Sequence, residues 1–176
     1  KSLKKISKPL VWTMRDMWVF TGGPHYTCDF EDYEQSKFSN FLKKFKKNNY
    51  PHHTQFIAIS NWLKLEAKKS SVLKSFEIKK IDNNVDIENF KVIDQMKAKQ
   101  LLNIKTKKKI ILYGSQNPQS ERKGWDIFIE TLNKLDKSNF FLIIFGNFWS
   151  KSVLDRIGIE YKSFGFVNDR NLLNII

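Results

Sequence analysis

The chain of 176 residues has a single cysteine, Cys28, and only four arginines among its 31 basic residues. One cysteine excludes a disulfide framework and a cysteine-based zinc cluster within the chain, and it permits a reducing compartment. Arginine makes the forked contacts that read bases, so its scarcity argues against base-specific recognition of nucleic acid. The sequence therefore favours neither a disulfide-rich secreted domain nor a sequence-specific DNA-binding domain.

Long hydrophobic runs are also lacking. The longest, residues 140–145, has the length of a buried strand, whereas a membrane span needs roughly 18 apolar residues. The basic start, residues 1–8, is not followed by a long apolar stretch, so no signal peptide is predicted. The chain begins with lysine and ends within an apolar pattern at Ile175-Ile176. We therefore expect a fragment of a longer protein.

Motifs for metals and nucleotides are missing as well. The three histidines, His25, His52 and His53, match no spacing of a metal site, so no metal is expected. The glycines, seven in all, form neither a Walker A sequence nor a G-x-G-x-x-G fingerprint. Any phosphate site must therefore use another arrangement of backbone and lysine.

Positive charge is abundant. The formal net charge is +13, and lysines cluster at residues 43–44, 46–47, 105 and 107–109. Dispersed lysine is typical of a solvated surface, but it also suits an anionic membrane surface or nucleic acid. With 41% hydrophobic and 28% charged residues, the chain has the composition of a globular protein.

Apolar runs and helical periodicities alternate along the chain, which predicts an α/β fold with parallel sheets flanked by helices. The segment 125–135, for example, places its apolar residues on one helical face. The predicted strands are residues 10–14, 56–59, 78–81, 110–113, 140–145 and 161–166. The predicted helices are residues 38–45, 62–73, 94–102, 125–135 and 153–157, with another beginning at 168–169. The polar, lysine-rich segment 86–108 marks a boundary between two domains, which we place between residues 87 and 88.

In parallel sheets, ligands bind at the carboxyl ends of strands. This rule selects the loops after residues 14, 81, 113 and 145. The loop after residue 113 carries Gly114 and Ser115 at the strand end and Arg122-Lys123 at the start of the next helix. A lysine beside a helix N-terminus fits a bound anion, although a solvent-exposed lysine after a turn is the plainer interpretation.

The loop after residue 14 combines Arg15 and Asp16 with Gly22, Gly23 and His25. The charged pair is either an ion pair alone or part of a site, and a lone histidine is more often structural than catalytic.

The loop after residue 81 contains Asn83, which suits a turn between domains and could also contact a polar ligand such as a sugar.

Taken in order, these segments resemble the retaining sugar-nucleotide glycosyltransferases of the GT-B fold, family 4 type. VWTMRDMWVFTGGPHY resembles a strand-end motif of that family, and FIAISNWLKLEAKKSSVL resembles the segment that follows it. KKIDNNVDIENF resembles the interdomain hinge, and IILYGSQNPQSERKGWDIFIETL resembles the phosphate loop. FFLIIFGN and KSFGFVNDRNLL resemble the next two strands, so the resemblance covers nearly the whole chain.

The resemblance implies two Rossmann-like domains, the acceptor-side one ending in residues 1–87 and the nucleotide-sugar-binding one beginning in residues 88–176. It also implies roles for individual residues. Lys123, with Arg122 as a second charge, would contact the donor diphosphate above Gly114 and Ser115. Asp16 and Arg15 would face the transferred sugar as the catalytic pair. Gly22, Gly23, His25 and Asn83 would lie in sugar- or acceptor-binding loops.

The sequence departs from the family pattern at several of these positions. Arg15 stands where many members have histidine, and Pro24 replaces a cysteine. Asp82 and Asn84 replace the hinge proline and glycine, and Gln116 replaces an arginine of the phosphate loop. The family's pair of glutamates eight positions apart has no counterpart in this chain. These differences leave Lys123 as the principal predicted contact to the diphosphate.

The function implied by the resemblance is transfer of a sugar, with retention, from a nucleotide diphosphate to a glycan or lipid-linked acceptor. The expected context is bacterial polysaccharide or lipopolysaccharide synthesis in the cytoplasm, at the inner face of the membrane. No metal cofactor and no nucleic acid partner are expected, and we expect no turnover from the 176 residues alone. The alternative is a non-enzymatic basic module that binds nucleic acid or an anionic membrane surface.

Overall fold

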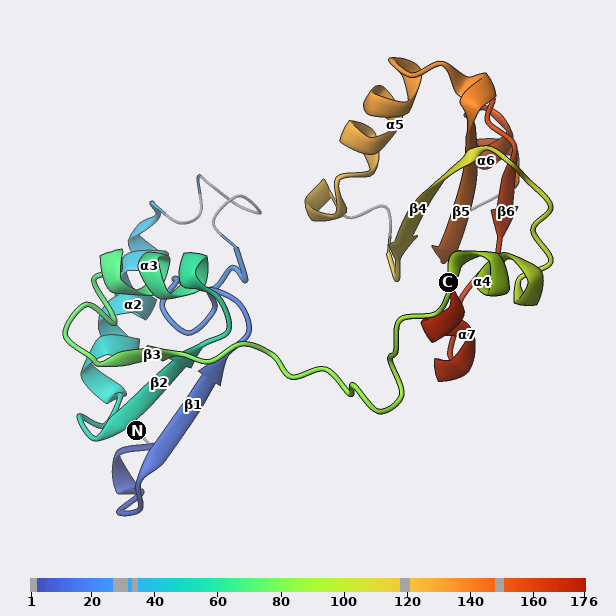
Figure 1. Cartoon of the computed structure of the whole chain (residues 1–176). Helices are drawn as coiled ribbons and strands as arrows, with labels where there is room; N and C mark the ends of the chain where they lie inside the picture. Colours follow the sequence, from blue (N-terminus) through green and yellow to red (C-terminus); the bar gives the residue numbers. More distant parts are fainter. Residues whose placement is uncertain (1–2, 27–31, 33–34, 118–120, 148–150) are drawn as a thin grey trace. The chain divides into compact units, whose positions relative to one another are not determined.

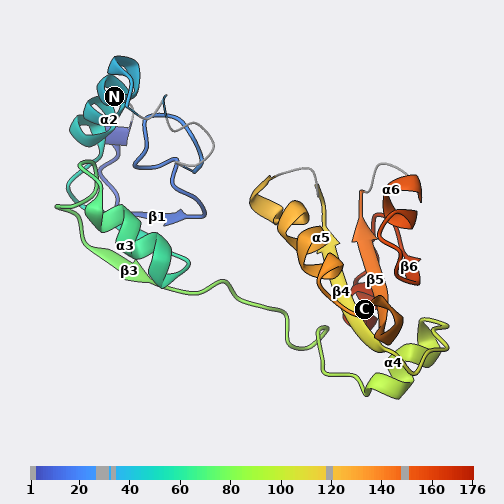
Figure 2. The ribbon, with the colours of Figure 1, turned by 90° about the horizontal axis from the view of Figure 1, so that it is seen from above.

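The computed structural model describes residues 3–26, 32, 35–117, 121–147 and 151–176. Its internal contacts divide the chain into two compact units, Lys1–Asn84 and Val85–Ile176, called unit 1 and unit 2 below. Each unit contains a three-stranded parallel sheet with helices packed against it (Figure 1). Residues 81–94, which follow the sheet of unit 1, form no helix or strand, as Figure 1 and Figure 2 show. The predicted α/β class with parallel sheets is confirmed.

Unit 1 has the sheet order β1-β2-β3, with both neighbouring pairs parallel. Its elements are η1 (Leu3–Lys5), β1 (Leu10–Met14), α2 (Lys37–Asn49), β2 (Thr54–Ala58), α3 (Asn61–Lys69) and β3 (Ile78–Lys80). The core lies between the sheet and α3, where Met14, Phe56 and Ile78 from the three strands are buried with Leu63 and Ala67 of the helix. Tyr50, directly after α2, packs its ring 5.6 Å from that of Phe56.

Serine side chains set the ends of the helices in unit 1. Ser36 and Ser60 cap α2 and α3, each accepting a hydrogen bond of 3.1 Å from the backbone N–H three residues later. The predicted helix over residues 62–73 is too long, because α3 ends at Lys69. The backbone of Ser70 is extended, and its hydroxyl accepts a hydrogen bond from the N–H of Leu73 in a separate turn.

Unit 2 has the sheet order β4-β5-β6, again with parallel pairs. Its elements are α4 (Gln95–Leu101), β4 (Lys109–Ser115), η3 (Glu121–Lys123), α5 (Trp125–Asn133), η4 (Lys137–Asn139), β5 (Phe140–Gly146), α6 (Lys151–Asp155), β6 (Tyr161–Ser163) and α7 (Arg170–Ile175). The central strand β5 is apolar on both faces, as its uninterrupted apolar run predicts. Leu142 and Ile144 pack with α5 and α6, whereas Phe141 and Ile143 pack with residues following α4 and with α7.

The observed ends of β4, β5 and β6 differ from the predicted ends, and a glycine lies at or near each of them. Strands β4 and β5 continue to Ser115 and Gly146, two residues and one residue beyond the predicted ends. The prediction of a strand to residue 166 is wrong, because Gly165 adopts the left-handed region at φ 61° and turns the chain. Its carbonyl nevertheless accepts a hydrogen bond from the N–H of Gly146, which keeps this turn beside the end of β5.

Within the described ranges, the helices are all too short or too polar to cross a membrane. Cys28 and residues 118–120 of the loop after β4 lie outside the part of the chain that the structure describes.

Candidate functional site

The loop after β1, residues 15–26, is held in place by side chains from α2 and from the residue that follows it. The Tyr50 hydroxyl donates to the carbonyl of Val19 at 2.6 Å. The Lys46 ammonium donates to the carbonyl of Thr21 at 3.0 Å and also to that of Trp18. These contacts satisfy carbonyls of an irregular loop that would otherwise be exposed to apolar surroundings, so the loop is a built part of the fold.

The glycines of this loop are required by close packing. A Cβ on Gly22 would lie 1.8 Å from the hydroxyl oxygen and 2.6 Å from the Cα of Ser39 in α2. Gly23 has a positive φ of 148°, which other residues rarely adopt. The glycine pair thus brings the loop against α2, and whether it also contacts a sugar stays a prediction.

The Asp16 carboxylate is paired with His25 across the loop. One carboxylate oxygen lies 2.7 Å from the ring nitrogen Nδ1 of His25, and the other accepts from the N–H of Trp18 at 2.9 Å. The Asp16 side chain is 28% exposed and that of His25 is 64% exposed. Of the two interpretations of Asp16 beside Arg15, an isolated ion pair is wrong, because the partner of Asp16 is His25. Arg15 is exposed, and no hydrogen bond or ion pair of its side chain is found among the described residues.

An ionised carboxylate only accepts hydrogen bonds, so Asp16 places the proton of a neutral His25 on Nδ1 and leaves Nε2 as an acceptor. We expect the Asp16→Asn variant to lose this preference, because an amide can donate as well as accept. The measurement is the pair of ¹⁵N shifts of the His25 ring above pH 8. A ring that keeps the same tautomer in Asp16→Asn would contradict the orienting role of Asp16.

Burial raises the pKa of the Tyr50 hydroxyl, which is nearly inaccessible to solvent. At neutral pH we expect Tyr50→Phe to lower the free energy of unfolding by about 1 kcal/mol through loss of one hydrogen bond. Above pH 10 the unfolded state of the native chain ionises first, so its own stability falls by about 1.4 kcal/mol per pH unit. Guanidinium unfolding at pH 8, 10 and 11 measures the difference in the free energy of unfolding between the native chain and Tyr50→Phe. We expect this difference to shrink and then change sign as the pH rises. A difference that does not depend on pH would contradict the prediction.

A second candidate region lies at the carboxyl ends of β4 and β5 in unit 2. A Cβ on Gly114 would fall 2.1 Å from the ring of Phe145, and one on Gly146 would fall 1.8 Å from the carbonyl oxygen of Ser115. The two strand ends therefore approach closely only because both positions are glycine. Ser115 is only 8% exposed at this point, and its hydroxyl has no hydrogen-bond partner among the described residues.

The backbone of Lys123 is tied to β4 through the side chain of Tyr113. The Tyr113 hydroxyl donates to the carbonyl of Lys123 at 3.0 Å, and burial raises the pKa of that hydroxyl. The Tyr113 ring stacks on Phe128 of α5 with 4.5 Å between ring centroids. Lys123 ends the short η3 turn, and α5 begins only at Trp125. The lysine therefore precedes the helix and its side chain is exposed there.

The first turn of α5 follows directly on Lys123 and Gly124. Its N-cap is Gly124, at φ 66°, and no side chain of the described residues caps it. Backbone N–H groups at such a helix start attract anions, and Lys123 adds a full positive charge just before them. Arg122 is also exposed in the same η3 turn. This end of unit 2 therefore carries backbone N–H groups and cationic side chains, and whether they bind a diphosphate stays a prediction.

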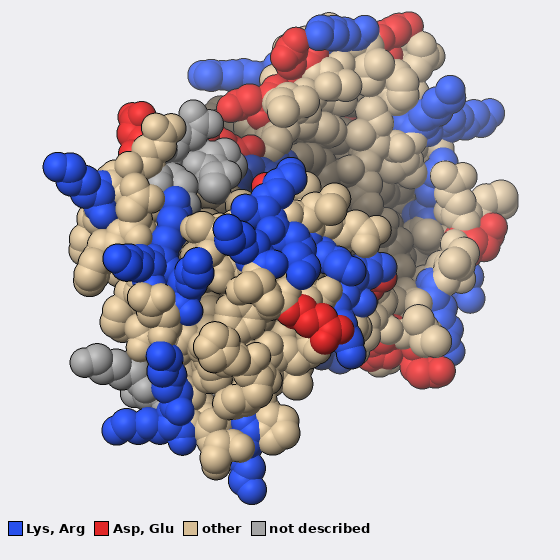
Figure 3. Space-filling model, turned by 90° about the vertical axis from the view of Figure 1, so that its left-hand side faces the viewer, with Lys and Arg blue, Asp and Glu red and all other residues tan. Residues whose placement is uncertain are grey.

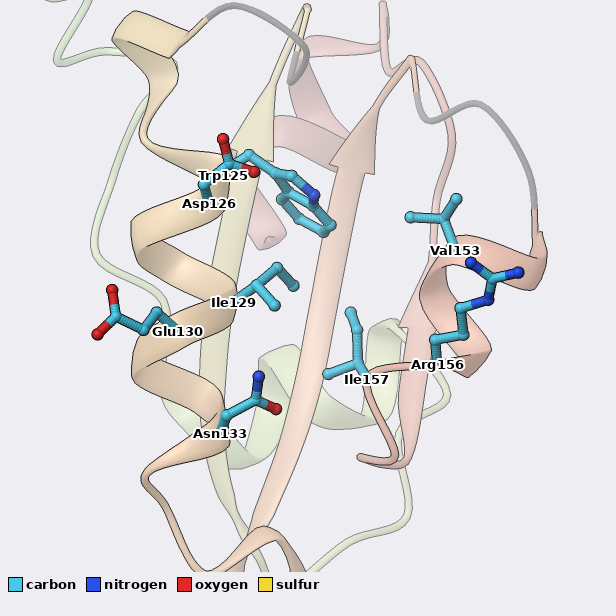
Figure 4. Close-up of a pocket in the computed structure, with 8 residues that line it drawn as sticks. All are labelled: Trp125, Asp126, Ile129, Glu130, Asn133, Val153, Arg156 and Ile157. Carbon is cyan, nitrogen blue, oxygen red and sulfur yellow. The ribbon is translucent and has the colours of Figure 1, made fainter.

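A groove of about 390 Å³ lies between α5 and the α6 region, and Figure 4 shows the side chains that line it. Its upper end in that view is formed by Trp125 and Asp126, in the first turn of α5. Arg156 lies on the other wall, whereas the Glu130 carboxylate points away from the groove and pairs with Lys134. The groove therefore begins at the first turn of α5, next to the predicted phosphate contact Lys123.

Asn83 lies after β3 in the segment of residues 81–94 and is exposed. The neighbouring Asp82 pairs with Lys80, which fixes the start of this segment. The predicted contact of Asn83 with a sugar stays a prediction. Across the described ranges, no three His, Cys, Asp or Glu side chains are grouped so as to hold a metal ion.

The predicted residues thus fall into two sets, one in each unit. In unit 1, Arg15, Asp16, Gly22, Gly23 and His25 share the loop after β1, and Asn83 follows β3. In unit 2, Gly114 and Ser115 end β4, and Arg122 and Lys123 lie in the η3 turn before α5. The sequence reasoning missed the side chains that hold these sets, Lys46, Tyr50 and Tyr113. Lys46 and Tyr50 lie 25 to 31 residues from the carbonyls they bind, and no local pattern marks such a contact.

No protein-family model matches the chain, and no curated protein matches it. Among solved structures, it is similar to a sucrose-phosphate synthase from Thermosynechococcus elongatus, with a TM-score of 0.69 and 14% sequence identity. The similarity covers 97% of this chain and 42% of the synthase chain, so this chain spans less than half the length of that protein. At this identity the likeness shows the fold alone, and it confirms the predicted GT-B type of α/β architecture.

Proposed function

We propose that the chain is part of a glycosyltransferase, in which unit 2 binds the diphosphate of a nucleotide-sugar donor and unit 1 contributes to the acceptor side. The structural likeness to a sucrose-phosphate synthase supports this proposal at the level of fold. The observation that carries it is the buried hydroxyl of Ser115, without a described partner, at the end of β4. An unsatisfied buried polar group is unfavourable by about 1–3 kcal/mol, and a diphosphate oxygen would satisfy it.

In the donor role, Ser115 donates to a phosphate oxygen, and the backbone N–H groups of the first turn of α5 and the Lys123 ammonium neutralise its charge. Arg122 supplies a second cation from the same turn. Leaving-group departure creates negative charge on the diphosphate, so these groups bind the transition state more tightly than the ground state. They take the place of a metal ion in this proposal.

In unit 1, the proposed catalytic pair is Asp16 with Arg15, and the structure adds His25 as the partner of Asp16. Asp16 fixes the imidazole so that Nε2 can accept a hydrogen bond from a sugar hydroxyl. Gly22 and Gly23 shape the loop, and Asn83 supplies an amide from the segment after β3. Retention at the anomeric carbon, and an acceptor that is a glycan or a lipid-linked glycan of a bacterial surface polymer, are part of the proposal.

Titration of the chain with nucleoside diphosphates and with duplex DNA tests the proposal against a basic nucleic-acid-binding module. We expect a nucleoside diphosphate to bind and duplex DNA not to displace it. If DNA binds with a steep salt dependence and nucleoside diphosphates do not bind, the transferase assignment is wrong. We further expect no sugar transfer by the 176 residues alone, since they span 42% of the length of the matched synthase.

A further inference from the structure

The groove between α5 and the α6 region has walls that are tied together by a lysine. The Lys137 ammonium donates to the side-chain oxygen of Asn133 at 3.0 Å and to the carbonyl of Ile157 at 2.6 Å. Asn133 is the last residue of α5, and Ile157 lies two residues after α6. Because one cation bridges the two walls, the groove of about 390 Å³ is formed without a ligand, as small-molecule sites usually are.

The floor of the groove is apolar. In Figure 4 the side chains of Trp125 and Ile129 project from α5 toward α6, and those of Val153 and Ile157 project back toward α5. The Trp125 ring also contacts the Tyr113 ring edge-on, with 5.1 Å between centroids. A fixed indole beside branched aliphatic side chains is a rigid apolar surface, against which the C–H face of a ligand ring can pack.

Polar side chains stand around this floor: Asp126, Asn133 and Arg156. Asp126 and Arg156 are exposed, and neither side chain makes a hydrogen bond or an ion pair within the described ranges. The Asn133 side chain accepts from Lys137 with its oxygen, which leaves its NH₂ group to donate. The rim therefore offers a carboxylate acceptor together with amide and guanidinium donors.

The charges around the groove favour an uncharged ligand. The chain has a net charge of +13, and lysine and arginine side chains are more prominent than acidic ones on the face that Figure 3 shows, so its surface attracts anions in general. The groove differs, because it sets a carboxylate opposite a guanidinium wall. An anion would be repelled by Asp126, and an acyl chain would cover charged groups without pairing them.

We propose that this groove binds a pyranose unit of a neutral glycan. The C–H face of the sugar ring packs on the Trp125 indole. Its hydroxyls donate to Asp126 and accept from Asn133 and Arg156. The volume suits about one or two sugar rings. None of these side chains takes part in the proposed donor or acceptor contacts, so the inference goes beyond the proposed function and does not rest on it.

Titration of the full chain with cellobiose, maltose and lactose, followed by ¹⁵N–¹H NMR, tests the proposal. We expect at least one of them to cause saturable shift changes at the Trp125 indole N–H and the Asn133 side-chain amide. Arg156→Gln should weaken binding about tenfold or more, because a hydrogen bond to a charged group is lost. Val153→Phe should abolish binding without any change of charge, because the larger ring fills the groove.

Matched controls separate the groove from effects elsewhere in unit 2. Arg170→Gln removes an exposed arginine at the start of α7, and Ile127→Phe adds a ring at a position of α5 that is 70% exposed and does not line the groove. Both should bind disaccharide like the native chain, and circular dichroism checks that every variant folds. The proposal is wrong if no disaccharide causes saturable changes, if the Arg156 and Val153 variants bind like the native chain, or if the controls weaken binding as much.

Inorganic pyrophosphate, titrated into separate samples of the same proteins, distinguishes this inference from the proposed donor site. We expect pyrophosphate affinity in Val153→Phe to stay within about twofold of native, since this side chain makes no charged contact. A chain that binds disaccharide but not pyrophosphate would support the groove and contradict the donor site. Binding of pyrophosphate but of no disaccharide would do the reverse.

Discussion

The Lys123→Ala variant should bind inorganic pyrophosphate and nucleoside diphosphates roughly 10- to 100-fold more weakly than the native chain, the range expected for loss of one hydrogen bond to a charged group. The reason is geometric as well as electrostatic. The backbone of Lys123 is tied to the Tyr113 hydroxyl at 3.0 Å, so its ammonium starts from a fixed point beside the end of β4. Calorimetric titration at low salt measures the effect.

The matched control is Lys134→Ala. Lys134 follows the last turn of α5 and pairs with Glu130 at 2.7 Å, so its removal changes the net charge by the same amount at the opposite end of the helix. We expect its affinity for pyrophosphate to stay within about twofold of native, because an exposed charge far from the ligand is screened. Equal losses in the two variants would mean that binding follows net charge rather than a site at Lys123.

The Gly146→Ala variant should be less stable than the native chain by about 2–5 kcal/mol, from overpacking and the strain of a positive φ together. Its Cβ would lie 1.8 Å from the carbonyl oxygen of Ser115, a backbone atom that cannot rotate away. The φ of Gly146, 121°, is also a conformation that alanine resists. Because Ser115 is the residue displaced, pyrophosphate binding should be lost as well.

Gly158→Ala provides the comparison for this prediction. Gly158 has a positive φ of 68°, but the nearest atom to an added Cβ, on Lys137, is 3.8 Å away. This variant therefore reports the backbone strain without the clash, about 1–2 kcal/mol. Thermal unfolding of both variants separates the two contributions. If Gly146→Ala is no less stable than Gly158→Ala, the close approach of the two strand ends does not exist in solution.

The fold could be predicted because the order of apolar residues in the sequence matches the faces that the sheets bury. Residues 140–145 form one apolar run, and a run buried on both faces is what a central parallel strand requires. The helices predicted to begin at residues 62 and 94 begin at Asn61 and Gln95, where the side chains of Ser60 and Asp94 cap them. The strand predicted to residue 166 failed since the turn at Gly165 depends on its φ, which the sequence pattern does not encode.

From the sequence, the loops that carry the candidate sites could be predicted, but the contacts of their side chains could not. The strand-end rule and the resemblance selected Asp16 and Lys123, but neither indicated what those side chains contact. The pairing of Asp16 with His25 spans nine residues of irregular loop, and it exists because Lys46 and Tyr50 hold the loop from outside. Likewise, the close approach of Gly146 to the carbonyl of Ser115 is a contact between two strands that no local sequence motif records.

Amide NMR of the full chain titrated with inorganic pyrophosphate tests the central claim most directly, because this ligand carries the diphosphate without a base or a sugar. The account predicts shift changes at Gly114, Ser115 and residues 123–126 that saturate together and that need roughly 10- to 100-fold more pyrophosphate in Lys123→Ala. The lysines of α2 should respond only weakly and without saturation. Saturable changes confined to α2, or none at the ends of β4 and α5, would contradict the assignment of unit 2 as the donor-binding unit.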